Sequence, residues 1–216
     1  MDTASFLGTS TLYLCTPSFG DLEKFREFTQ QVIAGGIDII QLRDRSLDVA
    51  SELKFYEVLK EETARTDVLV AVNDRADLAA VIGVDILHLG QKDLPPNEAR
   101  NLVGPQTLIG LSTSGEQLAY DAAARDEVDY FCVGPLWETP TKPGRKAIGL
   151  ETLTRTATEL KNKNVTKPWF AIGGIEATNL KQVLDAGARR VVVVRALTEA
   201  IDPYEETKKL KAQLRS

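Results

Sequence analysis

Short apolar runs alternate with longer amphipathic segments along the whole chain, and this alternation constrains the fold more than any single motif. Most runs are rich in Val, Ile and Leu and show little polar–apolar alternation, which is typical of strands buried on both faces. The runs predict eight strands, at Thr11–Cys15, Asp38–Arg43, Val68–Asn73, Ile86–Gly90, Thr107–Ser112, Tyr130–Pro135, Trp169–Gly173 and Arg190–Arg195.

The segments between these runs carry helical patterns, some with recognisable ends. Asp21 fits an N-cap, and Gly35–Gly36 fits a glycine stop for the first helix. Pro96 stands near a helix start, where its missing N–H costs little. The other helices are predicted at Leu47–Arg65, Ala76–Ile82, Pro96–Val103, Glu116–Arg125, Leu150–Lys161, Ala177–Ala186 and Thr198–Leu214.

Eight strand–helix units in 216 residues predict an α/β fold, a single-domain (β/α)8 TIM barrel over residues 1–216. A doubly wound open sheet is the alternative. An open sheet more often carries a G-x-G-x-x-G turn after its first strand, and Cys15-Thr16-Pro17-Ser18 carries none. We find no linker or low-complexity tract that marks a domain boundary.

Composition narrows the function classes. The net charge is −5, so the chain lacks the broad basic face of a nucleic-acid binder, and a local basic loop better fits a small phosphorylated ligand. No apolar stretch approaches the length of a membrane span, and the N-terminus lacks a signal-peptide pattern. Cys15 and Cys132 lie in apolar runs, which predicts buried thiols in a reducing compartment. We expect a cytoplasmic protein without nucleic-acid or membrane partners; whether it forms a homo-oligomer stays open.

Polar residues gather where the predicted strands end, and in barrels of this kind the chemistry lies at the carboxyl ends of the strands. Those ends carry, in order, Gln41-Leu42-Arg43-Asp44-Arg45, Asn73-Asp74-Arg75, Gln91-Lys92-Asp93, Ser112-Thr113, the loop Thr139-Pro140-Thr141-Lys142-Pro143-Gly144-Arg145, Gly173-Gly174-Ile175, and Arg195-Ala196.

Asp74 and Asp93 follow neighbouring strands, which lie about 5 Å apart, so their carboxylates can converge on one cation. Two carboxylates with water or substrate phosphate as the other ligands are how Mg²⁺ is usually held. The alternative gives each a separate role, Asp74 as a helix N-cap and Asp93 as a turn residue. Because they stand one strand apart, we favour the Mg²⁺ site.

Arg43, Arg45 and Lys142 would offset the charge of a diphosphate. The alternatives are surface ion pairs of the arginines with Asp44 or Asp48, and a plain connector for the loop around Lys142. Gly173-Gly174 stands where barrels often bind phosphate through backbone N–H groups, although a tight turn would also explain two glycines.

The polar residues within the runs suit a heterocycle. Asn73 and Gln41 carry both donors and acceptors, and Gln41 needs a buried partner. Ser112 could bond a heterocycle edge or cap a helix that starts near Gly115. His88 is the only histidine, and a lone histidine in a strand is more often a satisfied core residue than a catalyst. Without a Ser/His/Asp triad or a zinc site, catalysis would depend on charge and positioning.

Together these motifs resemble the thiamine-phosphate synthase family, over nearly the whole chain. The resemblance implies a (β/α)8 barrel that joins an aminopyrimidine methyl diphosphate to a thiazole phosphate with Mg²⁺, releasing diphosphate. It implies that Asp74 and Asp93 hold Mg²⁺, with Arg43, Arg45, Lys142 and Ser112 as catalytic residues. It places the pyrimidine diphosphate on Gln41, Leu42, Arg43, Asp44, Arg45, Asn73, Ser112 and Lys142, and the thiazole phosphate on Thr139, Pro140, Thr141, Gly173, Gly174, Val194 and Arg195.

The chain departs from the family pattern at two positions. The family commonly has lysine where Arg45 stands, which keeps the charge and changes its geometry. It often has serine where Arg195 stands, and an arginine there could bind phosphate or crowd the pocket.

Three other functions fit parts of the sequence. A thiazole tautomerase uses a histidine, and this chain offers only His88. A sensor that binds thiamine phosphate would not need the aspartate pair. A sugar-phosphate epimerase usually has paired acid/base residues, which the strand ends do not supply.

Overall fold

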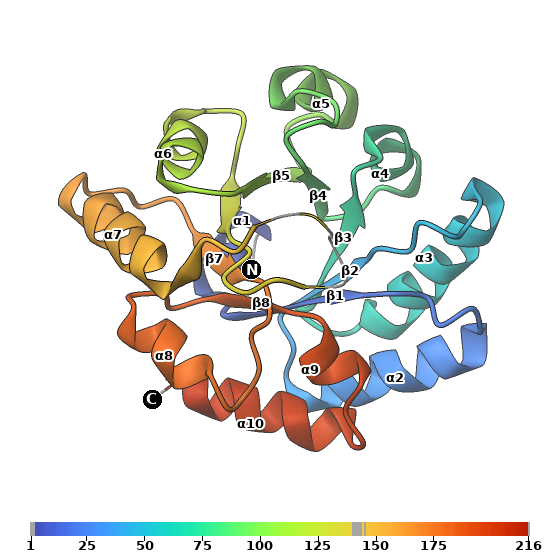
Figure 1. Ribbon diagram of the computed structural model, residues 1–216. Coiled ribbons are helices and arrows are strands. Elements are labelled where there is room, and N and C mark those ends of the chain that lie inside the picture. The colour runs from blue at the N-terminus through green and yellow to red at the C-terminus, as the bar shows by residue number, and fades with distance from the viewer. Residues whose placement is uncertain (1–2, 140–143, 145, 216) are drawn as a thin grey trace.

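The computed structural model describes residues 3–139, 144 and 146–215, and within them eight parallel strands close into a barrel (Figure 1). Each strand pairs with its neighbours in the sequence, and β1 pairs with β8 to close the ring. The strands are β1 (Leu12–Thr16), β2 (Ile39–Leu42), β3 (Leu69–Asn73), β4 (Ile86–Leu89), β5 (Leu108–Thr113), β6 (Tyr130–Val133), β7 (Trp169–Ile172) and β8 (Val191–Val193). The predicted (β/α)8 barrel is confirmed, and the open sheet is excluded.

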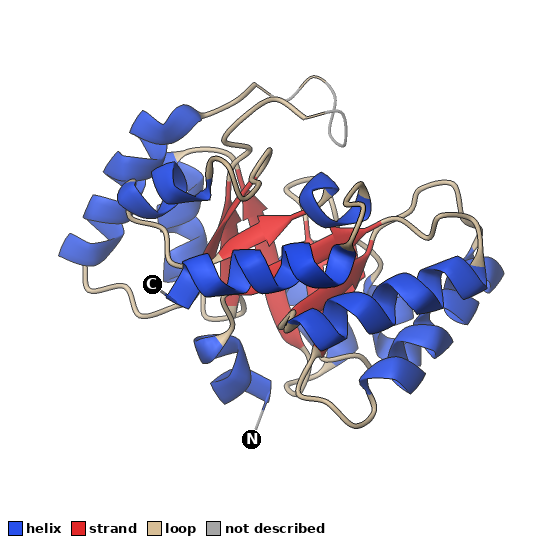
Figure 2. Cartoon of the chain, turned by 90° about the horizontal axis from the view of Figure 1, so that it is seen from below, coloured by secondary structure: helices blue, strands red, loops and turns tan. Residues whose placement is uncertain are grey.

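Helices surround the barrel, as the two views show (Figures 1 and 2). They are α1 (Thr3–Thr9), α2 (Leu22–Gly35), α3 (Val49–Thr63), α4 (Ala76–Ile82), α5 (Pro96–Val103), α6 (Glu116–Ala124), α7 (Gly149–Asn162), α8 (Leu180–Asp185), α9 (Arg195–Thr198) and α10 (Pro203–Arg215). In the described part of the chain, no helix has both the length and the apolar character that crossing a membrane requires.

Two helices, α1 and α9, were not predicted from the sequence, and α9 begins within the predicted eighth strand. The eighth strand was expected to run to Arg195, but β8 ends at Val193 and α9 begins at Arg195. Val194 has φ −127° and ψ −87°, which takes the backbone out of the extended conformation. The other missed helix is α1, which lies at the end of the barrel beside the N-terminus (Figure 2).

The predicted ends of α2 are confirmed. The Asp21 side chain accepts a hydrogen bond from the Lys24 backbone N–H at 3.0 Å, and Gly36 ends the helix with φ 95°. Asp48 caps α3 in the same way, accepting from the Ser51 N–H at 2.7 Å. Asp48 therefore serves as the N-cap of α3.

Residues that point into the barrel alternate with residues that face the helices. Tyr13, Ile39 and Phe170 belong to the cluster that fills the barrel, whereas Leu14 and Ile40 belong to the larger cluster between the strands and the helices. The inward positions become polar toward the carboxyl ends of the strands, where the side chains are Gln41, Asn73, His88 and Ser112. The interior of the barrel is therefore apolar along most of the strands and ends in a layer of polar side chains, the polar floor, at their carboxyl ends.

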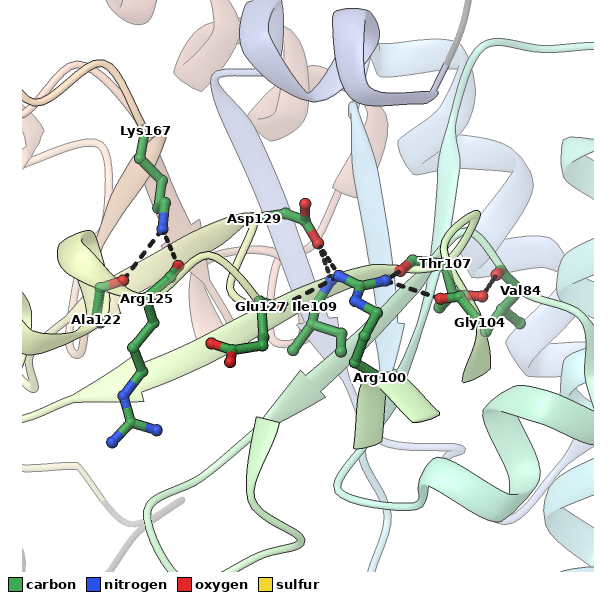
Figure 3. A network of polar contacts seen from close by, with 10 residues as sticks. All are labelled: Val84, Arg100, Gly104, Thr107, Ile109, Ala122, Arg125, Glu127, Asp129 and Lys167. Atoms are coloured by element: carbon green, nitrogen blue, oxygen red, sulfur yellow. Dashed lines mark hydrogen bonds and ion pairs between the residues drawn. The ribbon is translucent and has the colours of Figure 1, made fainter. Parts of the chain in front are cut away.

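A guanidinium at the opposite end of the strands ties α5 to β5 and β6 (Figure 3). Arg100 donates to the Gly104 and Thr107 carbonyls at 2.9 and 2.6 Å and to the Asp129 carboxylate at 2.6 Å. Asp129 in turn accepts from the Ile109 backbone N–H at 2.7 Å. This network holds the amino-terminal ends of two strands in place and lies away from the carboxyl ends.

We expect Arg100→Met to lower the free energy of unfolding by about 2 kcal/mol, because the substitution leaves partly buried backbone carbonyls and a carboxylate without their hydrogen-bond donor. Turnover should stay intact. Arg155→Met is the matched control, since Arg155 pairs with Glu116 on the surface and is 52% exposed. Exposed pairs of this kind contribute little to stability, so the loss should be much smaller. Urea denaturation of both variants checks the contrast, and equal losses would contradict it.

Candidate active site

A cavity of about 170 Å³ opens at the carboxyl ends of the strands. Nine of the residues predicted for the site line it, from strand ends that lie far apart in the sequence: Gln41, Arg43, Asn73, Ser112, Thr139, Gly173, Gly174, Val194 and Arg195. The closed barrel brings them together, because the carboxyl ends of all its strands face the same way.

Other predicted residues lie outside the lining of this cavity. The Leu42 side chain is fully buried in the cluster between strands and helices. Asp74, Asp93 and Arg45 are not among the lining residues. Pro140, Thr141 and Lys142 fall outside the described residues.

Asp44 has a structural environment. Its carboxylate accepts hydrogen bonds from the Ser18 hydroxyl at 2.6 Å and from the Ser46 hydroxyl at 2.6 Å. Burial alone would raise the pKa of Asp44, but these hydrogen bonds outweigh it and lower the pKa to about 2. Asp44 therefore fastens the β2–α3 loop to the loop after β1.

The Asp74 and Asp93 carboxyl groups lie within reach of each other. Burial raises the pKa of Asp74, and the neighbouring Asp93 raises it further through a hydrogen bond and through its charge. Asn73 and Arg43, which both line the cavity, act in the opposite direction on Asp74. Two carboxylates this close repel each other unless a proton or a cation lies between them.

Neither separate role predicted for these aspartates fully explains them. Arg75, not Asp74, is the N-cap residue of α4, and no side chain caps that helix. Asp74 itself adopts a left-handed backbone conformation, φ 62°, and its N–H donates to the His88 carbonyl at 2.9 Å. Asp93 does close a turn, because it accepts from the Gly90 N–H at 2.6 Å.

This carboxylate pair suits Mg²⁺, which prefers oxygen ligands and keeps several waters or substrate oxygens. Within the described residues no group of three or more histidine, cysteine or acidic side chains could hold a metal. A cation bound by Asp74 and Asp93 would therefore leave most of its coordination sites to water and to a phosphorylated ligand.

Two arginines border the carboxylate pair. Arg43 lines the cavity, and its charge acts on Asp74. Arg45 lies farther out, with its side chain 75% exposed and its guanidinium 3.8 Å from the Asp74 carboxylate. Positively and negatively charged groups thus alternate at this edge, and the arginines can donate charge-assisted hydrogen bonds to an anion.

The glycine pair after β7 leaves no room for side chains. Gly173 has φ 104°, and a Cβ there would lie 2.5 Å from the Pro135 Cβ. Gly174 has φ 70°, and its Cβ would lie 2.9 Å from the Trp137 Cβ. Both glycines line the cavity, so a ligand can approach this bare backbone closely.

Polar side chains at the cavity floor are hydrogen-bonded to one another. Gln41 has the buried partner that its sequence position required, because it accepts from the Tyr13 hydroxyl at 2.8 Å. Ser112 lies 2.9 Å from His88 Nε2, and the N-cap of α6 is Gly115, without a side-chain cap, so Ser112 is not a helix cap. His88 is buried with both ring nitrogens in contact with a hydroxyl, as expected of a satisfied core histidine.

Two acidic residues of the cavity were missed in the sequence, Glu176 and Glu199. Glu176 follows the glycine pair by two residues and could have been found by reading one turn further. Glu199 directly follows α9, and because that helix was not predicted, the place of Glu199 at the cavity was not predicted either. The remaining lining residues that were not predicted for the site are Cys15, His88, Thr113, Gly134, Pro135, Ile172, Ile175, Val192 and Ala196.

The chain is similar to known proteins over nearly its whole length. The family model described as "Thiamine monophosphate synthase" matches residues 12–197. A thiamine-phosphate synthase of Thermobifida fusca is 50% identical over 208 residues, which cover 96% of this chain and 94% of that protein. One of Mycobacterium tuberculosis is 50% identical over 220 residues, which cover 97% of each.

Solved structures share the fold of this chain. A thiamine phosphate pyrophosphorylase from Pyrococcus furiosus superposes with a TM-score of 0.84 at 27% identity, covering 97% of each chain. A 3-hexulose-6-phosphate synthase, with a TM-score of 0.64 at 20% identity, shares the fold alone.

Proposed function

Because the chain belongs to the thiamine monophosphate synthase family, we infer that it is a transferase that makes thiamine phosphate. It joins 4-amino-2-methyl-5-pyrimidinylmethyl diphosphate to a thiazole phosphate and releases diphosphate. The observation that carries this function is the match at about half of all positions, 50% identity over 208 residues, to a thiamine-phosphate synthase. The site residues below are our assignment on this barrel.

We assign the diphosphate to the edge of the cavity where Asp74, Asp93 and Arg43 meet. Bound Mg²⁺ would supply positive charge to the diphosphate there. Arg43 and Arg45 add donors for the same oxygens, and Lys142 belongs to this set by family resemblance. Gln41, Asn73 and Ser112 on the cavity floor would hold the pyrimidine ring.

We assign the thiazole phosphate to the opposite side of the cavity. The bare backbone of Gly173 and Gly174 supports this placement, with Thr139 and the Val194–Arg195 segment beside it. Thr141 and Pro140 complete the set by resemblance. Arg195 brings a positive charge to a place where Glu176 and Glu199 bring negative ones, so it would offset their repulsion of a phosphate.

These assignments suit a dissociative substitution. The bond from the methylene carbon to the diphosphate oxygen breaks, and its electron pair leaves with the diphosphate. The ring nitrogen of the thiazole then donates its lone pair to the methylene carbon. No side chain has to abstract a proton in either step, so the chain contributes charge and orientation, which are often the largest catalytic terms.

Incubation with both phosphorylated substrates and Mg²⁺ tests the function. We expect thiamine phosphate and diphosphate in equal amounts, measured by fluorescence after oxidation and by a coupled diphosphate assay. An isomerised thiazole without diphosphate would instead identify a tautomerase, and tight binding of thiamine phosphate without turnover would identify a sensor.

A further inference from the structure

A chain of hydrogen bonds crosses the barrel beneath the cavity and links side chains from six strands. It contains groups that are buried and that no step of the reaction uses. In order, it runs through Asn73, Gln41, Tyr13, Tyr130, His88 and Ser112. The two tyrosines are fully buried, and His88 is 5% exposed. In a buried network of this kind, the hydrogen-bond donor at each contact limits which atom can donate at the next contact.

The direction of donation along this network is set where Gln41 meets Asn73. The Gln41 Nε2 atom lies 2.7 Å from the Asn73 Oδ1 atom and donates to it. An amide carries its donor and its acceptor on opposite branches, so the Gln41 Oε1 atom is left as an acceptor on the side that faces Tyr13.

The donor and the acceptor at each tyrosine hydroxyl then follow from this orientation. Gln41 presents its Oε1 to Tyr13, whose hydroxyl donates to it at 2.8 Å. Each tyrosine hydroxyl has a single hydrogen. Tyr13 has used its own, so it accepts from Tyr130 across 3.1 Å. Tyr130 has then used its hydrogen as well, and it can only accept from His88 Nδ1 across 2.9 Å.

The last two links decide how Ser112 meets a ligand. If Nδ1 of the neutral imidazole carries the hydrogen, Nε2 is an acceptor. The Ser112 hydroxyl, 2.9 Å from Nε2, then donates to the ring. Its lone pairs are left for the cavity that Ser112 lines.

Gly110 shows that the barrel is built around this arrangement. Gly110 pairs with Tyr130 across β5 and β6, and a Cβ at position 110 would lie 2.1 Å from the Tyr130 ring. Any larger residue would push the ring away. The glycine thus admits the hydroxyl that joins Tyr13 to His88.

We propose that Tyr13 and Tyr130 are positioning residues that carry the orientation of the Gln41 amide across the barrel to His88, so that Ser112 acts as a hydrogen-bond acceptor toward its ligand. The ligand group at Ser112 is then a donor, such as an N–H. The choice of the aminopyrimidine, whose exocyclic amine is such a donor, rests on the proposed function.

The single histidine makes the network directly measurable. In protein labelled with ¹⁵N-histidine, long-range ¹H–¹⁵N spectra at neutral pH without ligand report which ring nitrogen carries the hydrogen. We expect the Nδ1–H tautomer in the wild type. In Tyr13→Phe the Tyr130 hydrogen is released to His88 Nδ1, so we expect a switch to Nε2–H. Tyr130→Phe should give the same switch by removing the Nδ1–H acceptor.

Tyr56→Phe is the matched control, because Tyr56 is also fully buried but donates to the Leu42 carbonyl at 3.4 Å, outside the network. It should keep the wild-type tautomer. Wild-type protein with Nε2–H or a doubly protonated ring would overturn the network, as would an unchanged tautomer in Tyr13→Phe and Tyr130→Phe.

Kinetics separate positioning from stability. In Tyr13→Phe we expect KM for the pyrimidine diphosphate to rise about tenfold, the cost of one mismatched hydrogen bond, with KM for the thiazole phosphate unchanged. An equal rise in both would show a general structural defect and overturn the positioning role. If no variant and no wild-type protein makes product, the proposed function fails, and the tautomers still decide the network.

Discussion

Asp74→Asn and Asp93→Asn should each lower the Mg²⁺-dependent turnover at least about a hundredfold, because each substitution removes one charge from the pair that is assigned to the metal. Asp93→Asn keeps a side-chain oxygen for the Gly90 N–H, which Asp93 accepts at 2.6 Å, so the turn should survive. Asp74→Asn keeps a similar shape and removes the repulsion between the two carboxyls. Steady-state diphosphate release over a range of Mg²⁺ concentrations measures the loss.

Asp77→Asn is the matched control for these two variants. Asp77 lies in the first turn of α4 and is held by Arg75 outside the cavity. It should retain wild-type turnover. Circular dichroism and thermal unfolding should show that all three variants fold. Normal activity in both Asp74→Asn and Asp93→Asn would remove the metal assignment.

Gly173→Ala should damage both folding and the binding of the thiazole phosphate. The added Cβ would lie 2.5 Å from the Pro135 Cβ and 2.6 Å from its Cα, on a backbone with φ 104°. We expect a loss of about 3 kcal/mol in the free energy of unfolding, from overpacking together with the left-handed conformation. We also expect a large rise in KM for the thiazole phosphate, because the backbone assigned to its phosphate has to move.

Gly83→Ala separates crowding from backbone strain. Gly83 also has a positive φ, 66°, but a Cβ there would meet nothing within 4 Å. It should lose about 1 kcal/mol and keep normal kinetics. Urea denaturation and initial rates with varied thiazole phosphate compare the two variants. Wild-type KM in Gly173→Ala would show that the glycine pair is only a tight turn.

The fold could be predicted from the sequence because strand and helix periodicities differ clearly. Continuous apolar runs such as Val68–Asn73 identified strands buried on both faces, and the structure places β3 at Leu69–Asn73. The misses are short elements. The helix α9 has only four residues, too few to show a helical period, and it begins directly after a Val-rich strand.

The candidate site was predicted in part, for a geometric reason. Residues at the strand ends, such as Asn73 and Ser112, converge in any closed parallel barrel, so their position in the sequence was enough. Which side chains turn into the cavity depends on local contacts. Asp44 accepts a hydrogen bond from Ser18, in the loop after β1, and no sequence pattern indicates that contact.

The buried network shows the limit most clearly. The sequence indicated that Gln41 needs a partner, but the partner is Tyr13, 28 residues away on the next strand. His88 was recognised as a satisfied core residue, and its contacts are Tyr130 and Ser112 from two other strands. Pairings inside a barrel depend on register, which periodicity does not determine.

The two departures from the family pattern lie at different depths. Arg45, where lysine is common, is mostly exposed and lies 3.8 Å from the Asp74 carboxylate. Arg195, where serine is frequent, begins α9 and lines the cavity together with Glu176 and Glu199. The extra positive charge at position 195 therefore comes with two carboxylates.

A crystal structure of the protein with Mg²⁺, thiamine phosphate and diphosphate would test the account most directly. We predict the metal between the Asp74 and Asp93 carboxylates, with the diphosphate beside Arg43. The phosphate of the product should lie on the backbone N–H groups of Gly173 and Gly174. A metal bound elsewhere, or a phosphate far from the glycine pair, would contradict the assignment of the two anions to opposite sides of the cavity.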